Sequence, residues 1–161
     1  MAERYGSLDV QNSATVSATS DAAAALASIL ASTDPIEAAR LAGALWHARS
    51  LKLVLSGPAV AGLVAQIGRR AHAFGLRNAQ AAVEATPISD PVTLASAIER
   101  DGLLCLGACA SGSPALRLRL AVMLAPGTPV DADHLPASFL TNAPAVLARV
   151  AAELDDGRHD G

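Results

Sequence analysis

The sequence predicts an α/β protein, with a doubly wound parallel sheet of four to five strands flanked by helices. Short apolar runs recur along the chain, and each is followed by a turn containing glycine or serine and then by a helical pattern. Strands that are apolar on both faces are typical of parallel sheets covered by helices on both sides. Hydrophobic residues make up 52% of the chain but aromatic residues only 2%, so we expect a core of Ala, Val, Leu and Ile.

Four segments have the length and the apolar character of buried strands. The clearest is the run that ends at Ser56-Gly57-Pro58, where glycine and proline interrupt the apolar pattern. A second apolar run, at 103–106, precedes a loop rich in Gly, Ala and Ser. We expect strands at 51–56, 78–84, 102–107 and 128–131.

Helical patterns separate these segments. Asp34-Pro35 pairs a capping residue with proline at the first helical position, which predicts the start of a helix over 35–48. In that helix Glu37, Arg40 and His47 are expected on the polar face. Further helices are expected at 21–31, from about 60 to 74 with Gly75 as the C-terminal stop, at 91–100, and at 142–154 with Val146, Val150 and Leu154 facing inward.

Residues 116–124 fit two descriptions. Alternation of Leu and Arg has the period of a strand, whereas Leu116, Leu120 and Met123 also have helical spacing. The cap-and-proline pair Ser113-Pro114 favours the helix.

The bulk properties indicate one domain over 21–154, with flexible tails at 1–20 and 155–161. A net charge of −3 and the lack of a basic stripe argue against nucleic-acid binding. The apolar runs are shorter than a membrane span requires, and the first 20 residues lack the apolar core of a secretory signal. We therefore expect a cytoplasmic protein without membrane contact. Two cysteines are too few for a standard zinc site, and no metal or cofactor is predicted.

Two loops are candidates for ligand binding, because ligands gather at the carboxyl ends of parallel strands. One contains Ser56 and Gly57, and the other contains Ser111, Gly112 and Ser113. Two hydroxyls and a glycine at the start of a helix suit an anion such as phosphate. From spacing alone, a plain serine N-cap with a glycine turn is the favoured explanation of the second loop.

The segment 56–66 resembles the first motif of sugar isomerase (SIS) domains, which reads Gly-x-Gly-x-Ser before a helix. Gly57 matches the first glycine, Ala59 replaces the second glycine and Ala61 replaces the serine. The second loop is similar to the phosphate loop of that family, Ser-x-Ser-Gly-x-Thr, with Ser111 and Gly112 matching and Cys109 in place of the leading serine.

The resemblance implies a SIS-like sheet, binding of a small anionic ligand such as a sugar phosphate, and a homodimer. It also implies either aldose–ketose isomerisation or a degenerate, regulatory role. An isomerase needs a base with a pKa near 7. Glu84 and His134, which follow expected strands, are the catalytic candidates. Helices 21–31 and 35–48 are the expected dimer contacts.

Two other functions are compatible with the sequence. Cys109 follows an expected strand near a helix N-terminus, a position that can lower the pKa of a thiol and produce a nucleophile. The segment 52–60 is similar to the first strand of small sulfur-relay proteins of the DsrE type, which would make this chain a sulfurtransferase. The other alternative is a non-catalytic subunit whose scaffold serves assembly alone.

Overall fold

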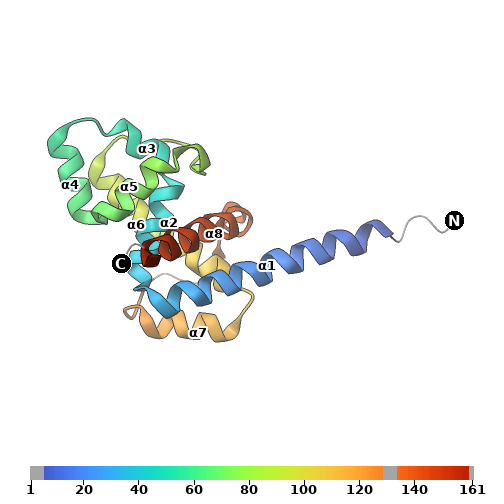
Figure 1. The fold of residues 1–161 in the computed structure, drawn as a ribbon. Coiled ribbons are helices and arrows are strands. Elements are labelled where there is room, and N and C mark those ends of the chain that lie inside the picture. The colour runs from blue at the N-terminus through green and yellow to red at the C-terminus, as the bar shows by residue number, and fades with distance from the viewer. Residues whose placement is uncertain (1–5, 129–133, 160–161) are drawn as a thin grey trace.

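The computed structural model describes residues 6–128 and 134–159. The described residues are mainly helical, and the helices are joined by loops (Figure 1). In chain order the elements are α1 (Gly6–Ser32), α2 (Pro35–Trp46), α3 (Ala48–Leu53), α4 (Gly57–Ile67), α5 (Arg69–Arg77), the 3₁₀ turn η1 (Ala79–Ala81), α6 (Pro91–Ala110), α7 (Pro114–Met123) and α8 (Ala137–His159).

The prediction of an α/β fold is wrong, because the described residues contain no strand and therefore no sheet. The segment 102–107 lies inside α6, and 51–53 forms the end of α3. In the segment 78–84 a short 3₁₀ turn is followed by a loop, and of 128–131 only residue 128 is described. The sheet edge and the doubly wound topology expected from the SIS resemblance are therefore absent from the described chain.

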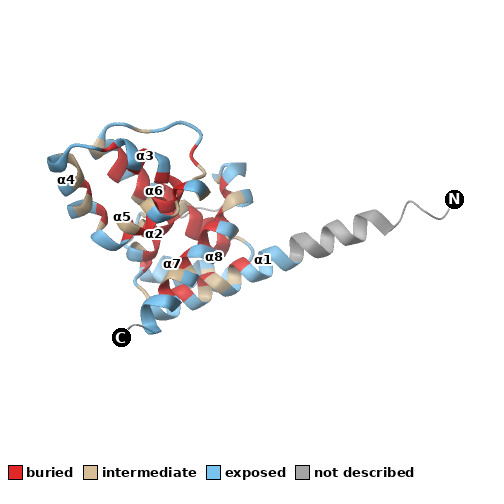
Figure 2. Cartoon of the chain, turned by 45° about the horizontal axis from the view of Figure 1, so that its top comes forward, coloured by how far each residue is buried: buried red, intermediate tan, exposed pale blue. Residues whose placement is uncertain are grey.

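The failure at 102–107 has a physical cause. An apolar run of four to six residues cannot distinguish a buried strand from a helix that is buried on all sides. Helix α6 is such a helix: nearly every residue from 101 to 110 is buried (Figure 2). Its apolar run contains Leu and Cys but no β-branched residue, so nothing in its composition favours a strand.

The centre of the molecule is the crossing of α2 and α6. Gly43 of α2 lies against the backbone of Ile98, and Gly102 of α6 lies against the backbone of Ala39. These reciprocal contacts bring the two backbones together without an intervening side chain. Both helices are consequently buried along most of their length (Figure 2).

Helices α1 and α8 pack together beside this centre, and α8 also packs on α6. Toward the N-terminus α1 extends away from the body of the molecule (Figure 1). At the start of α8, Phe139 stacks on Trp46 with ring centroids 4.2 Å apart and ring planes 7° from parallel. This stack attaches α8 to the end of α2.

The helix expected from 60 to 74 is two helices. Gly68 has φ of 91°, which ends α4 and begins α5 at a bend. Gly75, expected as the stop, lies inside α5, where it is buried against Leu51 and the carbonyl of Ala44. Its lack of a side chain serves packing and does not end the helix.

Several helix signals are confirmed. Asp34 caps α2 by accepting hydrogen bonds from the backbone, and Ser113-Pro114 begins α7, so 116–123 is helical. Val146, Val150 and Leu154 face inward on α8 as expected. Helix α1 is longer than the expected 21–31, and α6 continues ten residues beyond the expected end at 100. No helix in the described ranges has the length and hydropathy needed to cross a bilayer.

Candidate functional site

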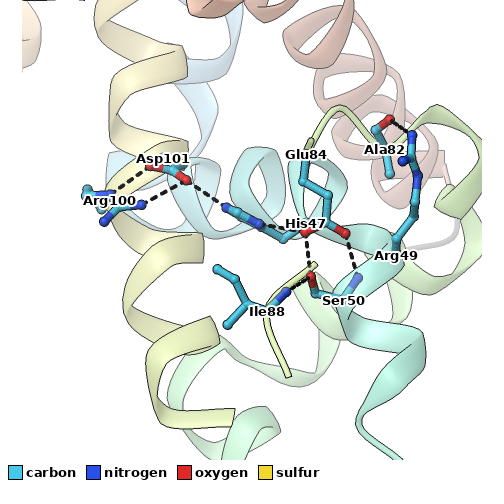
Figure 3. A network of polar contacts seen from close by, with 8 residues as sticks. All are labelled: His47, Arg49, Ser50, Ala82, Glu84, Ile88, Arg100 and Asp101. Atoms are coloured by element: carbon cyan, nitrogen blue, oxygen red, sulfur yellow. Dashed lines mark hydrogen bonds and ion pairs between the residues drawn. The ribbon is translucent and has the colours of Figure 1, made fainter. Parts of the chain in front are cut away.

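A buried network of charged side chains connects three parts of the chain (Figure 3). His47, between α2 and α3, contacts two carboxylates. Its Nδ1 lies 2.9 Å from Oε2 of Glu84, and its Nε2 lies 2.7 Å from Oδ2 of Asp101 on α6. The three side chains are at most 9% exposed. The network therefore fixes the loop after η1 against both central helices.

Ser50 completes the network from the side of α3. Its backbone N–H donates to Oε1 of Glu84 at 2.6 Å, and its hydroxyl donates to Oε2 of the same carboxylate. The Ser50 oxygen also accepts a hydrogen bond from the backbone N–H of Ile88 at 2.9 Å. Backbone N–H groups of Val83 and Glu84 donate to the carbonyl of Trp46, which holds the loop at the end of α2.

The geometry favours a protonated His47. Both ring nitrogens face carboxylate oxygens, and only the imidazolium form donates from both. Burial alone would lower the pKa of His47, but hydrogen bonds to Asp101 and Glu84 outweigh it and raise that pKa above 6.5. Burial likewise would raise the pKa of Asp101, yet hydrogen bonds from His47 and Arg100 hold it below 3.8. The site is thus a buried ion cluster.

Ser50, His47 and the two carboxylates do not form a nucleophilic triad. In such a triad the serine hydroxyl donates to the histidine, which then removes its proton. Here the Ser50 hydroxyl donates to Glu84, and neither nitrogen of His47 is free to accept. No buried side-chain N or O atom of the described residues lacks a hydrogen-bond partner. In the cluster each of these side chains is held by another member.

A cavity of about 470 Å³ opens beside the cluster, and Asp101, Trp46 and Phe139 contribute to its wall. Arg100 also lines it and donates from Nε to Oδ1 of Asp101 at 2.8 Å. Since His47 and Arg100 occupy both carboxylate oxygens, Asp101 offers the cavity no free acid or base.

The two predicted catalytic residues are not brought together. Glu84 is buried in the cluster, whereas His134 is exposed just before α8 and takes no part in the network. Among the described residues, no group of three or more His, Cys, Asp or Glu side chains is arranged to hold a metal ion.

The two predicted ligand loops act as helix caps in the structure. Ser56 caps α4 by accepting from the N–H of Ala59, with Gly57 as the first residue of that helix. Ser113 caps α7, and the hydroxyl of Ser111 donates to the carbonyl of Ala108. Gly112 lies beside these two serines, between α6 and α7. The start of α4 and the α6–α7 junction lie on different sides of the body (Figure 1). The structure does not place these loops in one crevice, and phosphosugar binding remains an untested prediction.

Cys109 is inside α6, not in a loop. It is 4% exposed, and burial raises the pKa of its thiol to about 12. Burial also raises the pKa of Cys105, one helical turn earlier, well above its usual value. At neutral pH both sulfurs are therefore thiols, the less nucleophilic form.

The buried positions of His47 and Asp101 are not predicted by the sequence pattern. His47 was expected on the polar face of its helix, but it is 4% exposed. Asp101 was placed beyond a helix ending at Arg100, although it lies in the middle of α6. A helix continued from Arg100 through the apolar run at 103–106 places Asp101 inside a buried helix. A carboxylate in that position requires a partner, and this requirement is the signal in the sequence for the cluster.

Exposed apolar side chains form a second candidate site, on the surface. On α7, Leu118 is 67% exposed and Val122 is 77% exposed, and their i, i+4 spacing puts them on one face with Met123 beside them. We call these three residues the α7 face. The opposite side of the helix packs inward through Leu120 and Leu124.

A similar surface lies between α3 and α4. Leu53 is 54% exposed and Leu55 is 85% exposed; we call this pair the α3–α4 turn. No residue from 53 to 68 carries a charge, and α4 buries only Leu63 and Ile67. Clustered exposed apolar residues of this kind mark surfaces that contact other molecules.

Across its described residues the protein is a helical bundle with a buried ion cluster and two exposed apolar surfaces. No family model matches the sequence, and no solved structure matches it significantly. The chain is similar to the nodulation protein NolU of Rhizobium fredii, with 48% identity over 104 residues. The NolU protein of Sinorhizobium fredii gives the same values. The match covers 64% of this chain and 49% of the relative, so the chain spans about half the length of the curated relatives it matches.

Proposed function

We propose that this protein is a non-catalytic subunit that assembles with other proteins, in a process related to the one that NolU serves. The observation that carries the proposal is the pair of exposed apolar surfaces on a helical body with a packed core. The α7 face and the α3–α4 turn expose large Leu, Val and Met side chains that the fold leaves uncovered.

The chemistry of the interior supports an assembly role over catalysis. The titratable groups of the ion cluster are all engaged with each other, and the cysteines are buried thiols. The 48% identity over 104 residues to NolU, a protein named for nodulation, supports a role in nodulation.

The test is whether complex formation depends on these surfaces. The full chain, tagged and expressed at its native level, is compared with Leu118→Asp/Val122→Asp and with Leu53→Asp/Leu55→Asp. Sedimentation of the purified chain measures self-association, and size-exclusion chromatography of cell extracts measures larger complexes. We expect a discrete complex with the wild type and its loss in at least one double variant.

A control variant adds the same negative charge elsewhere. Ala145 and Ala152 are exposed on α8, so Ala145→Asp/Ala152→Asp should retain the complex. All variants should keep the helical circular dichroism and the unfolding midpoint of the wild type. A wild-type chain that is monomeric both when purified and in extracts would refute the assembly role.

A further inference from the structure

We infer that a cavity between α3, α5, η1 and α8 is a binding site for a phosphate group. The cavity has a volume of about 460 Å³, and its wall is mainly polar, in contrast to the two apolar surfaces. Lys52 of α3, Arg77 of α5 and Arg149 of α8 line it, together with the amide side chains of Asn78 and Gln80. Volumes of this size are typical of small-molecule sites.

The cavity concentrates positive charge in a chain whose net charge is −3. Arg77 is neutralised, because its guanidinium lies 2.8 Å from Oε1 of Glu153. Within the described chain, Lys52 and Arg149 have no carboxylate partner. The excess charge favours an anion, and a concave wall strengthens the field inside.

The polar groups are held in place by the fold. Arg149 donates from Nη1 to Oδ1 of Asn78 at 3.2 Å, and the Asn78 amide nitrogen donates to the carbonyl of Phe74. Arg149 therefore lines the cavity from α8, and the hydrogen bond to Asn78 engages only the Nη1 end of its guanidinium. Lys52 and Gln80 are exposed and also line the cavity.

A phosphate group matches this set of donors. It carries about −1.5 to −2 charges at neutral pH and three acceptor oxygens. The ammonium of Lys52, the guanidinium of Arg149 and the side-chain amide of Gln80 supply three donor groups, one for each acceptor oxygen. The group can belong to free phosphate or to a phosphate ester, and both present the same oxygens to Lys52 and Arg149. Phosphate binding here is independent of the proposed assembly role.

The experiment measures binding of inorganic phosphate, pyrophosphate and glucose 6-phosphate to the full chain, with glucose as the uncharged control. Calorimetry at fixed ionic strength gives the affinity, and backbone amide NMR shifts at Asn78 and Gln80 give the location. We expect at least one phosphate probe to bind and to shift these amides. Equal binding of all three probes assigns the site to the bare group, and preference for the sugar ester assigns it to an ester.

Two matched variants test the assignment. Lys52→Gln/Arg149→Gln removes two charges from the cavity and should weaken binding about tenfold. Arg69→Gln/Arg117→Gln removes two exposed charges outside the cavity and should change the affinity less than about twofold. Equal losses in both variants would show that binding follows net charge alone and would overturn the site.

A third variant works in the opposite direction. Glu153→Gln removes the carboxylate that neutralises Arg77, so phosphate affinity should rise a few-fold. This gain cannot be produced by partial unfolding. Absence of binding by every phosphate probe at millimolar concentration, or a loss of affinity in Glu153→Gln, refutes the phosphate site and leaves the assembly role unaffected.

Discussion

Gly43 and Ile98 are in direct backbone contact where α2 crosses α6. A Cβ placed on Gly43 would lie 1.8 Å from the carbonyl oxygen of Ile98, and a Cβ on Gly102 would lie equally close to the carbonyl oxygen of Ala39. The distance between the central helices is therefore set by two glycines. Most of the buried side chains pack around this crossing.

Gly43→Ala should destabilise the protein by about 3 kcal/mol, at the upper end of overpacking costs, because a backbone carbonyl cannot move aside as a side chain can. Chemical unfolding followed by circular dichroism measures the change. Gly62→Ala is the matched control. Nothing lies within 4 Å of its added Cβ, so the gain in helix propensity should stabilise α4 by up to about 1 kcal/mol. Equal stabilities of the two variants would contradict the close crossing.

Stability should fall as the pH rises above about 6.5, because of His47. Its pKa is raised in the folded state, so the folded chain retains a proton that the unfolded chain releases. The contribution of the ion cluster is fully present below the unfolded pKa of about 6.5 and is lost as the pH rises through the folded pKa. Urea unfolding at a series of pH values from about 6 to 9 measures this slope.

Asp101→Asn should reduce that slope, because it removes one of the two carboxylates that raise the pKa of His47. His159→Gln, an exposed position at the end of α8, should leave it unchanged. A pH profile that is the same in the wild type and in Asp101→Asn would mean that His47 is not the titrating group.

Both cysteines should be unreactive in the folded protein. With a pKa of about 12, Cys109 at pH 8 has roughly one thiolate per ten thousand molecules, and burial also blocks the reagent. Titration with a chromogenic disulfide reagent should show slow reaction without denaturant and two fast thiols in urea. Fast labelling of Cys109 in the native state would restore a nucleophilic role for this residue.

The stack of Phe139 on Trp46 should couple α8 to α2. Phe139→Ala removes a buried ring and should cost about 3 kcal/mol, whereas Phe139→Leu should cost less because it keeps more apolar volume. Trp46 is the chain's one tryptophan, so its fluorescence reports this contact directly. An unchanged emission spectrum in Phe139→Ala would contradict the stacked geometry.

Local signals in the sequence predicted local structure well. A serine or aspartate before a proline defines a helix start through its own hydrogen bonds, and Asp34-Pro35 and Ser113-Pro114 do so in the structure. The inward face of α8 was likewise readable from the spacing of Val146, Val150 and Leu154. These features depend on residues within one or two helical turns of each other.

The same local signals gave wrong predictions where one short motif fits two different structures. Ser111 and Ser113 have the pattern of an anion loop and of a helix cap, and the SIS resemblance rested on such short glycine–serine motifs. In the structure both hydroxyls form hydrogen bonds with backbone groups three residues away in the chain. Glu84 was singled out as a base, but its partners His47 and Ser50 lie more than 30 residues earlier in the chain and could not be recognised from spacing.

The sequence by itself determined where α2, α6 and α7 begin, how apolar the interior is and which residues carry charge. Only the tertiary structure decided that the apolar runs at 51–53 and 103–106 are helical and that His47 and Asp101 are buried together. The reason is that a short apolar run indicates burial of a segment but not its secondary structure. Whether it is covered by neighbouring strands or by helices depends on contacts such as Gly43 with Ile98, which join residues far apart in the chain.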